Sequence, residues 1–424
     1  MTEWKTYKLS DICDLVAGFA FKSKDFGDYP NKVVKIADIQ PPIVYVNDLA
    51  GVDLSAYNTS KLQKFIVSKG DYVLAMTGAT IGKLGRITNN IEAYINQRVL
   101  TFRPNKTIVD KNYLYYQLCS VNFSKYILNH IDSETAQPNI SAGSVGGFEF
   151  SLPSLKEQRR IAGILGAIDD KIENNRRINT NLELQAQALY KQWFVDFEFP
   201  NEEGKPYKSS GGKMLDSDLG PIPDGWSVIG YCDAVDIKGG GTPPTNNPEF
   251  WNGSIPFFTP KDVPSDCFAI HTEKSITEAG LSNCNSKLYA KDTVFITARG
   301  TVGKVVMAGC SMAMNQTNYA LIGKNELSQY FVYLLTIALV NRLLKKANGA
   351  VFNAITTRDF EGEQIVHPTN FVLGKFVDII SPLYQQVLSI AKENETLATL
   401  RDTLLPKLMS GELKISEYEI HISR

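Results

Sequence analysis

The sequence lacks the features that mark several large classes of protein. No apolar run approaches the about 20 residues that a membrane-spanning helix needs, and the longest, around residues 331–339, predicts a buried helix. The first residues show no basic segment followed by an apolar one, so we expect no signal peptide. Six cysteines are scattered without a C-x-x-C pair, which argues against a zinc site or a disulfide framework and indicates the cytoplasm.

An excess of charge of one sign is also missing. The 424 residues include 44 basic and 45 acidic side chains, for a formal net charge of −1. A nucleic-acid-binding protein is often basic, because phosphate contacts supply most of its non-specific affinity. Near neutrality therefore permits DNA binding only where lysines and arginines gather on one face. It also agrees with a subunit whose partners in a larger complex hold the phosphates.

Catalytic motifs are absent or imperfect, so we expect no catalytic residue and no metal ligand. Residues 78–84 resemble a phosphate-binding loop, but the spacing is one residue short and Leu84 stands where a hydroxyl side chain is required. Asp224, Asp236 and Lys238 match the degenerate carboxylate-and-lysine pattern of metal-dependent nucleases. The four histidines stand apart from any nucleophile or metal partner, which is typical of structural or surface residues.

What the sequence does contain is an internal duplication. Trp4 opens a segment that recurs at Trp226, and Pro153 recurs as Pro368. The separation between matching residues therefore falls from 222 to 215 residues along the repeat. Between these points Asn96-Gln97 recurs as Asn315-Gln316. A tandem duplication predicts a pseudo-two-fold molecule, which suits a target that also comes in two halves.

Composition and periodicity divide the chain into six segments. Short β-rich runs (32–39, 71–76 and 94–103) and one helix (112–129) predict a globular α/β domain, which the second copy repeats. We therefore predict an α+β protein with two tandem, pseudo-repeated globular α/β domains separated by two long helices. The segments are a first domain (1–152), a central helical spacer (153–200), a Gly-, Ser- and Pro-rich linker (201–225), a second domain (226–367), a distal helical spacer (368–415) and a tail (416–424).

Both spacers carry apolar residues at alternating steps of four and three, the repeat of a coiled coil. The predicted seam consists of Ile161, Leu165, Ile168, Ile172, Asn175, Asn179, Leu182, Leu189, Phe376, Ile380, Leu383, Val387, Ile390, Asn394, Leu397 and Leu404. An alternative is two amphipathic helices that each pack only on their own domain. The seam asparagines favour an antiparallel coiled coil, because a buried amide needs a partner and fixes register. In that arrangement Asn175 faces Asn394.

Proline at position 382 complicates the distal spacer. Because proline removes a helical hydrogen bond, we expect a kink at Ser381-Pro382 or a continuous helix that begins there.

Several segments, in the right order along nearly the whole chain, resemble the specificity subunits of type I restriction–modification systems. They are residues 240–243, 248–251 and 255–263, then 299–303 and 315–316, then 152–162 and 193–197 around the central helix, and 404–413 at the end of the distal one. The first domain departs more, with Ala17-Gly18-Phe19-Ala20-Phe21 where the second has Gly-Gly-Thr-Pro. Such divergence agrees with two domains that read different sequences.

The resemblance implies a non-catalytic subunit that binds double-stranded DNA. Each globular domain would be a target-recognition domain for one half of a bipartite, asymmetric site, and the helices would set the spacing. They would also dock two modification subunits, which carry S-adenosylmethionine and methylate adenine. Restriction (motor-nuclease) subunits, which use Mg and ATP, join where such a complex cuts DNA. No cofactor is expected in this chain.

Base reading requires hydrogen-bonding side chains on loops or strands that enter a groove, with Arg or Lys for guanine and Asn or Gln for adenine. The candidates in the first domain are Lys22, Lys24, Thr77, Thr80, Lys83, Asn96, Gln97 and Arg98, and in the second Thr242, Thr245, Asn246, Lys261, Arg299, Thr301, Lys304, Asn315, Gln316 and Thr317. Those shared by both copies have a second interpretation, as turn caps or phosphate contacts. Residues that differ, such as Gly78 opposite Arg299, are better candidates for specificity.

Two other functions are compatible with parts of the sequence. A self-sufficient magnesium-dependent nuclease would use Asp224, Asp236 and Lys238. A protein–protein scaffold that never touches DNA is favoured only by the neutral charge.

Overall fold

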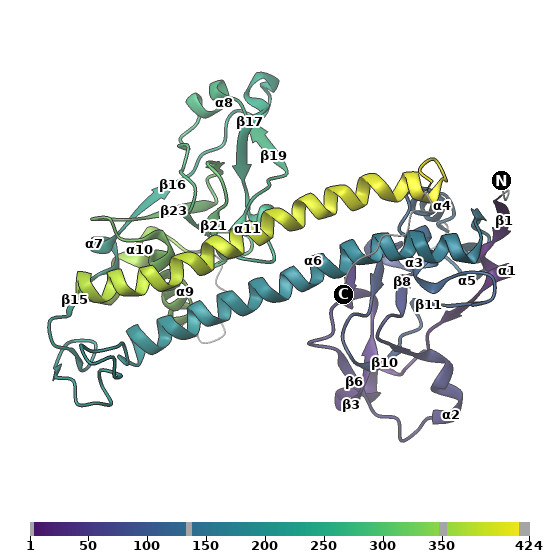
Figure 1. Ribbon diagram of the computed structural model, residues 1–424, viewed down its shortest axis with the longest axis horizontal. Helices are drawn as coiled ribbons and strands as arrows, with labels where there is room; N and C mark the ends of the chain where they lie inside the picture. The colour runs from purple at the N-terminus through teal and green to yellow at the C-terminus, as the bar shows by residue number, and fades with distance from the viewer. Residues whose placement is uncertain (1–3, 133–137, 347–353, 415–424) are drawn as a thin grey trace. The chain divides into compact units, whose positions relative to one another are not determined.

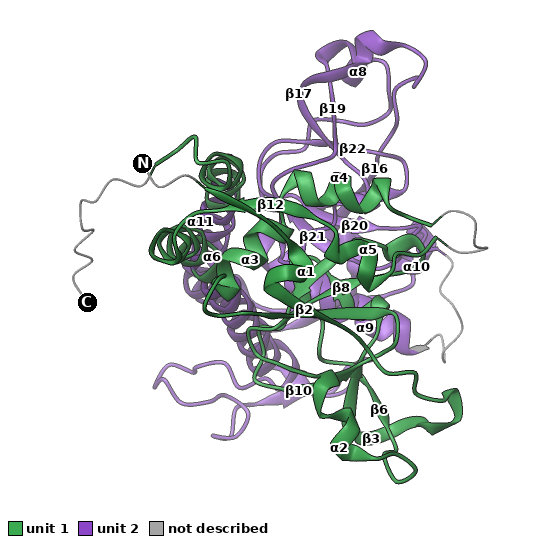
Figure 2. Cartoon of the chain, turned by 90° about the vertical axis from the view of Figure 1, so that its right-hand side faces the viewer, with its two compact units in different colours: residues 1–170, 397–424 green, residues 171–396 purple. Residues whose placement is uncertain are grey.

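The computed structural model describes residues 4–132, 138–346 and 354–414, so the predicted tail lies outside the described residues. The chain divides into two compact units, which are described separately (Figure 2). Unit 1 consists of residues 1–170 and 397–424, and unit 2 of residues 171–396. In the described parts, no helix is both long and apolar enough to cross a membrane.

Unit 1 contains a large sheet in the order β2-β11-β8-β9-β5-β4 and a small one in the order β6-β3-β10-β7. The small sheet lies on the side of the large sheet away from the long helices (Figure 1). The strands are β1 (Lys5–Lys8), β2 (Cys13–Ala17), β3 (Phe26–Val34), β4 (Ile39–Gln40), β5 (Ile43–Val44), β6 (Ala50–Val52), β7 (Ile66–Ser68), β8 (Tyr72–Ala75), β9 (Leu84–Arg86), β10 (Glu92–Ile95), β11 (Val99–Pro104) and β12 (Glu149–Leu152), which pairs with β1.

The helices of the unit 1 domain are short. They are α1 (Leu9–Ile12), α2 (Thr59–Leu62), α3 (Lys111–Leu118), α4 (Val121–Asn129) and α5 (Ala142–Gly146). The prediction of one helix over residues 112–129 is wrong. The Ser120 side chain accepts a hydrogen bond from the Phe123 amide and so begins a second helix, α4, after a break at Cys119.

Unit 2 repeats this arrangement. Its large sheet has the order β16-β23-β20-β21-β18, its small sheet β19-β17-β22, and β15 pairs with β24 as β1 pairs with β12. In both large sheets the order and directions of the matching strands agree, including the parallel pairs β5–β9 and β18–β21. The tandem duplication predicted from the sequence is therefore confirmed.

The strands of unit 2 are β13 (Met214–Leu215), β14 (Ile222–Pro223), β15 (Ser227–Gly230), β16 (Val235–Gly239), β17 (Trp251–Phe258), β18 (Phe268–Ala269), β19 (Lys274–Ile276), β20 (Val294–Thr297), β21 (Val305–Ala308), β22 (Ala313–Met314), β23 (Asn318–Gly323) and β24 (Gln364–His367). Its domain helices are α7 (Tyr231–Ala234), α8 (Glu278–Ser282), α9 (Gln329–Lys346) and α10 (Thr357–Glu361). The buried helix expected around residues 331–339 is the centre of α9.

Continuous apolar runs form the middle of each large sheet. All residues of β8 (Tyr-Val-Leu-Ala) and of β20 (Val-Phe-Ile-Thr) are buried. A strand with a partner on either side and both faces covered has no solvent face, so its sequence cannot alternate between apolar and polar. These strands position the turns that follow them, which carry candidate residues.

The two long helices are α6 (Leu155–Tyr190), which ends in a π-turn (Lys191–Val195), and α11 (Asn370–Met409). Every predicted seam residue is buried or half-buried. Within unit 2, Asn175 Nδ2 donates to Asn394 Oδ1 at 2.9 Å, and Asn179 Nδ2 donates to the Val387 carbonyl at 3.2 Å. The later residue of α6 therefore contacts the earlier residue of α11, so the two helices run in opposite directions. The antiparallel pairing and the Asn175–Asn394 contact are confirmed.

Of the two alternatives expected at Ser381-Pro382, a continuous helix that begins there is wrong. Helix α11 begins at Asn370 and continues through the proline. On the preceding turn, Phe376 and Ile380 are fully buried, and the Ser381 hydroxyl donates to the Val377 carbonyl at 2.6 Å. Tyr384, which follows the proline, is also fully buried, so packing on both sides of the proline outweighs the roughly 3 kcal/mol that it costs a helix.

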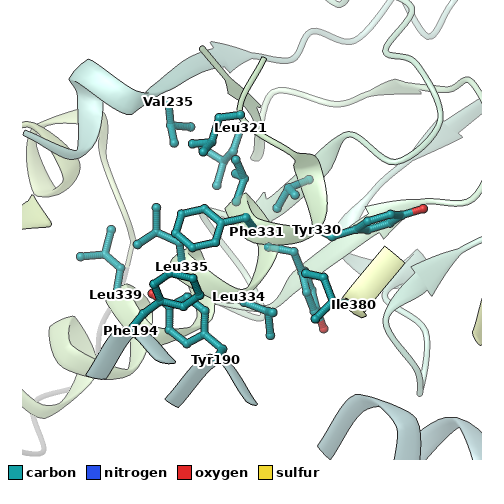
Figure 3. Close-up of a cluster of buried hydrophobic side chains, with 14 of the residues drawn as sticks. Tyr190, Phe194, Val235, Leu321, Tyr330, Phe331, Leu334, Leu335, Leu339 and Ile380 are labelled. Atoms are coloured by element: carbon teal, nitrogen blue, oxygen red, sulfur yellow. The ribbon is translucent and has the colours of Figure 1, made fainter. Parts of the chain in front are cut away.

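The core of unit 2 joins helix α9 to the long helices (Figure 3). Phe194 packs against Phe331 and Phe376, with ring centroids 5.0 and 4.7 Å apart. The predicted linker is partly folded on this unit, because Phe199 stacks between Tyr207 and Trp226 at 4.6 and 5.0 Å. Aromatic stacking holds this segment where its Gly- and Ser-rich composition alone suggested a loose connection.

A buried carboxylate ties the sheet of unit 1 to helix α3. Asp71 accepts hydrogen bonds from Lys111 Nζ at 2.6 Å and from the Ser68 amide at 2.9 Å, and it pairs with Arg103 at 3.3 Å. Burial alone would raise the pKa of Asp71. The hydrogen bonds from Lys111 and Ser68 and the charges of Lys111 and Arg103 outweigh it and lower the pKa.

We expect Asp71→Asn to lower the free energy of unfolding by about 2 kcal/mol at pH 7, because two cations lose their partner. Since the folded-state pKa of Asp71 is depressed, its contribution is complete above the ordinary carboxyl pKa and is lost as the pH falls through the lower folded value. Urea unfolding at pH 7 and pH 3 should therefore show the difference between wild type and variant shrinking at pH 3. Asp48→Asn, at an exposed carboxylate, is the control. A difference that does not change with pH would contradict this account.

Candidate nucleic-acid interface

In unit 2, four chain segments meet at one edge of the sheets. The Asn315 amide donates to the Phe258 carbonyl at 3.0 Å, and the Ala298 amide donates to the Thr317 carbonyl at 2.8 Å. The Gly241 amide donates to the Met314 carbonyl at 3.1 Å. These bonds gather the ends of β16, β17 and β20 and the turn between β22 and β23.

This edge brings together Thr242, Lys261, Arg299, Thr301, Asn315, Gln316 and Thr317 of the sequence-predicted residues. The Arg299 and Lys261 turns are neighbours, since a Cβ at Gly300 would lie 3.8 Å from the Pro260 Cβ. Thr245 and Asn246 are exposed on the loop that follows Thr242. Lys304 lies at the other end of the β20–β21 turn, where its amide donates to the Thr297 hydroxyl at 3.0 Å.

Unit 1 builds the same scaffold with other residues. The Asn96 amide donates to the Val34 carbonyl at 3.0 Å, the Met76 amide to the Arg98 carbonyl at 2.9 Å, and the Phe19 amide to the Ile95 carbonyl at 2.9 Å. The bonds place Thr77, Thr80, Asn96, Gln97 and Arg98 in one cluster, with Lys83 at the far end of the β8–β9 turn. Lys22 and Lys24 are exposed further along the loop after β2. Lys22 precedes the turn Ser23–Asp25 and Lys24 lies within it, and these hydrogen bonds do not place either lysine in the cluster.

The Asn-Gln dipeptide interrupts a predicted strand. Residues 94–103 read as one β-rich run, but the structure ends β10 at Ile95 and begins β11 at Val99. Likewise β3 ends at Val34 instead of continuing to residue 39, because Asp38 turns the chain by accepting from the Lys35 amide at 2.7 Å. The chain leaves one sheet and enters the other at these places, which sequence periodicity cannot show.

The structure corrects the correspondence between Gly78 and Arg299. Strand pairing matches Ala75 with Val99 in unit 1 and Thr297 with Asn318 in unit 2, which makes Ala75 and Thr297 equivalent. Thr77 therefore corresponds to Arg299, and Gly78 to Gly300. Both glycines have positive φ, 69° and 84°, which other residues rarely adopt. The second copy is one residue shorter within the turn.

Thr77 and Arg299 at this equivalent position differ in exposure as well as in chemistry. Thr77 is buried, whereas Arg299 is exposed. The turn also explains why the phosphate-loop likeness is only local. The segment connects β8 to β9, two antiparallel strands, and no helix follows to direct its N-terminus at a phosphate.

Two carboxylates that the sequence reading missed shape the site. Asp262 accepts from the Thr259 amide at 2.7 Å, as Asp38 accepts from the Lys35 amide. Burial raises the pKa of Asp38 despite that hydrogen bond. The signal was present in the sequence, since an aspartate follows the end of the matching strand at the same distance in both copies. Each carboxylate acts as a cap that orients the turn.

The positive charge at these edges comes from few residues. Lys83 and Arg98 in unit 1 and Lys261, Arg299 and Lys304 in unit 2 are exposed. Such cations attract phosphate even on a chain that is neutral overall, because the attraction depends on the local arrangement of charge.

Two of the three groups proposed for a nuclease pair with each other, and the third pairs with a different lysine. Asp224 pairs with Lys213 at 3.0 Å, and Asp236 pairs with Lys238 at 3.4 Å and Lys324 at 3.6 Å. In the described part of the chain, no three His, Cys, Asp or Glu side chains gather as a metal site would require.

Comparison with known proteins gives consistent matches over nearly the whole chain. The family model described as "Type I restriction modification DNA specificity domain" matches residues 1–184 and 223–399. The type I restriction enzyme HindI specificity subunit of Haemophilus influenzae is 25% identical over 97% of this chain and 100% of its own. The MjaIX specificity subunit of Methanocaldococcus jannaschii is 28% identical over 98% of this chain and 94% of its own. A crystal structure of the type I restriction-modification S subunit from M. genitalium shares the fold, with a TM-score of 0.56 and 15% identity over 98% of this chain and 97% of that one.

Proposed function

The chain belongs to the family of type I restriction–modification DNA specificity proteins, and from this premise we propose that it selects the DNA sequence on which such a complex acts. It is a non-catalytic subunit. Each unit would read one half of a bipartite, asymmetric site in double-stranded DNA, and the paired helices would set the spacing between the halves. It would act in the cytoplasm, where it meets cellular DNA.

The observation that carries the proposal is the pair of loop clusters, one in each unit. Equivalent backbone hydrogen bonds hold both clusters, but the side chains at equivalent positions differ in chemistry and exposure, as the buried Thr77 and the exposed Arg299 do. Two domains that recognise different DNA sequences require the same backbone framework with different side chains on it. Phosphate contacts fix the position of a protein on the duplex, whereas side chains at base edges discriminate sequence.

The chemistry would come from partner subunits. We propose that two modification subunits bind the paired helices, carry S-adenosylmethionine and methylate adenine at the site this chain selects. Restriction subunits using Mg and ATP would join the same assembly for cleavage. This chain's contribution is to bind the DNA in one register and so present the target adenines to the modification subunits.

The test is base-resolved adenine-methylation sequencing of host DNA with and without this gene, in the presence of the neighbouring methyltransferase gene. We expect a split sequence motif whose methylation disappears on deletion and returns when the gene is supplied on a plasmid. A methylation pattern that is identical with and without the gene, while the methyltransferase is expressed, would rule the function out. Magnesium-dependent cleavage by the purified chain would support the nuclease instead.

A further inference from the structure

The Asn-Gln dipeptide occupies the same place in both units but makes different hydrogen bonds. The backbone N–H of Asn96 donates to the Val34 carbonyl at the end of β3, and that of Asn315 donates to the Phe258 carbonyl at the end of β17. In each unit the acceptor strand is the parallel neighbour of the strand that precedes the dipeptide. The backbone positions are therefore equivalent. What differs is the environment of the side-chain amides, which are the groups able to read a base.

In unit 2 the Asn315 side chain is occupied by its own turn. Its Oδ1 accepts from the Thr317 amide at 3.1 Å, the Thr317 hydroxyl at 2.7 Å and Asn318 Nδ2 at 2.6 Å. A carbonyl oxygen has two lone pairs, so three donors leave none for a base. Asn318 is fully buried, which anchors this arrangement in the domain. Asn315 therefore caps the turn.

In unit 1 the two side-chain donors of this cap, the Thr317 hydroxyl and Asn318 Nδ2, are replaced. Arg98 and Val99 stand where unit 2 has Thr317 and Asn318, and the valine side chain has no hydrogen to donate. Asn96 is half-buried, and its side chain takes no hydrogen bond from the residues that the structure describes. Its amide oxygen and nitrogen remain available to a ligand.

For the neighbouring glutamine, the side chain is oriented by a partner in unit 2 but not in unit 1. In unit 2, the Thr242 hydroxyl donates to Gln316 Oε1, and the Gln316 side chain is exposed. The contact orients the amide while leaving one lone pair on Oε1 and both hydrogens of Nε2 free. Gly18 and Gly240 are equivalent, since a Cβ on either would collide with the Asn carbonyl at 2.2 or 2.1 Å. Thr242 therefore corresponds to Ala20, which cannot orient Gln97.

We propose that the base-reading amide is Gln316, oriented by Thr242, in unit 2 and Asn96 in unit 1. This inference rests on the proposed function. Adenine presents an acceptor, N7, and a donor, N6–H, in the major groove, and an amide with a free lone pair and a free N–H matches both at once. Gln316 and Asn96 each offer that pair, and Asn315 does not. In unit 2 the dipeptide thus supplies a turn cap, Asn315, and a base-reading residue, Gln316. In unit 1 it supplies a base-reading residue, Asn96.

The test uses methylation sequencing of host DNA with variants expressed beside the methyltransferase gene. Gln316→Ala and Asn96→Ala should each relax one A·T position, in opposite halves of the motif, with about a tenfold to hundredfold loss of preference at that position. Thr242→Val should weaken the same position as Gln316→Ala, and Thr242→Ser, which keeps the hydroxyl, should restore it. Asn315→Ala should lower the melting temperature of the purified chain without changing which bases are accepted.

The failure of the inference is distinguishable from the failure of the function. If Gln316→Ala lowers methylation equally at all sites and leaves every base preference unchanged, Gln316 contacts the phosphate backbone and the assignment is wrong. If Asn315→Ala changes the accepted base without lowering the melting temperature, Asn315 is the reader and the assignment is again wrong. If the wild-type chain directs no split motif, the proposed function fails and the assignment with it.

Discussion

Replacing unit 1 with that of another family member is expected to change one half of the methylated sequence and leave the other half unchanged. The reason is that each unit has its own sheets and its own loop cluster, so a new set of side chains in one does not disturb the other. Because each mismatched base pair costs a specific complex about 1–3 kcal/mol, several changed positions should abolish methylation of the old motif.

The structure decides where such an exchange has to be joined. A cut at residue 150 would divide β12, which pairs with β1 from Lys5↔Leu152 to Lys8↔Glu149. The junction should follow Asp170, where unit 1 ends, because Ile161, Ala162 and Leu165 of α6 are buried in the core of this unit. The end of α11 must match as well, since Leu408 and Met409 are buried in the core of unit 1. The exchange should therefore include residues 397–414.

Methylation sequencing of the chimaera is the measurement. The matched control exchanges residues 397–414 alone but keeps the buried Leu408 and Met409, so that the core of unit 1 is undisturbed. This segment holds none of the predicted base readers, and both halves of the motif should be kept. If the full exchange altered both halves, the two units would not read independently. If the control altered one half, the distal helix would itself take part in recognition.

Phe376→Ala is expected to lower the free energy of unfolding by about 3–5 kcal/mol, the range for removing a buried phenylalanine and leaving a cavity. Phe376 has 0% of its surface exposed. Its ring contacts those of Trp193, Phe194 and Phe331, at 5.5, 4.7 and 6.2 Å between centroids. This residue joins both long helices and helix α9, so few rearrangements could fill the space.

Phe371→Ala on the same helix is the matched control. Phe371 is 66% exposed and touches the ammonium of Lys375, 4.2 Å from its ring centroid. Its removal should cost about 1 kcal/mol or less. Urea unfolding followed by tryptophan fluorescence measures both variants, since Trp193 lies in the affected core. Equal losses for the two variants would mean that this cluster does not anchor α11.

Local periodicity made much of the fold predictable. The apolar spacing of the spacers predicted two long helices and their seam, and the asparagines within the seam predicted the Asn175–Asn394 contact. These features depend on which side chains share one face of a helix, a property that neighbouring residues determine. The helix break at Ser120 was missed because the cap depends on one hydrogen bond, which composition over a window averages away.

The sequence by itself determined the duplication, the long helices and the candidate positions, because these depend on order along the chain. Only the tertiary structure decided which candidates are equivalent and which are free to act. Glycine turns absorb a one-residue difference without shifting either strand. Local sequence similarity therefore places Gly78 opposite Arg299, whereas strand pairing shows that Thr77 is equivalent to Arg299. Whether Asn315 is a cap or a reader depends on the hydrogen-bond donors that the folded turn and a buried neighbour bring to its amide oxygen.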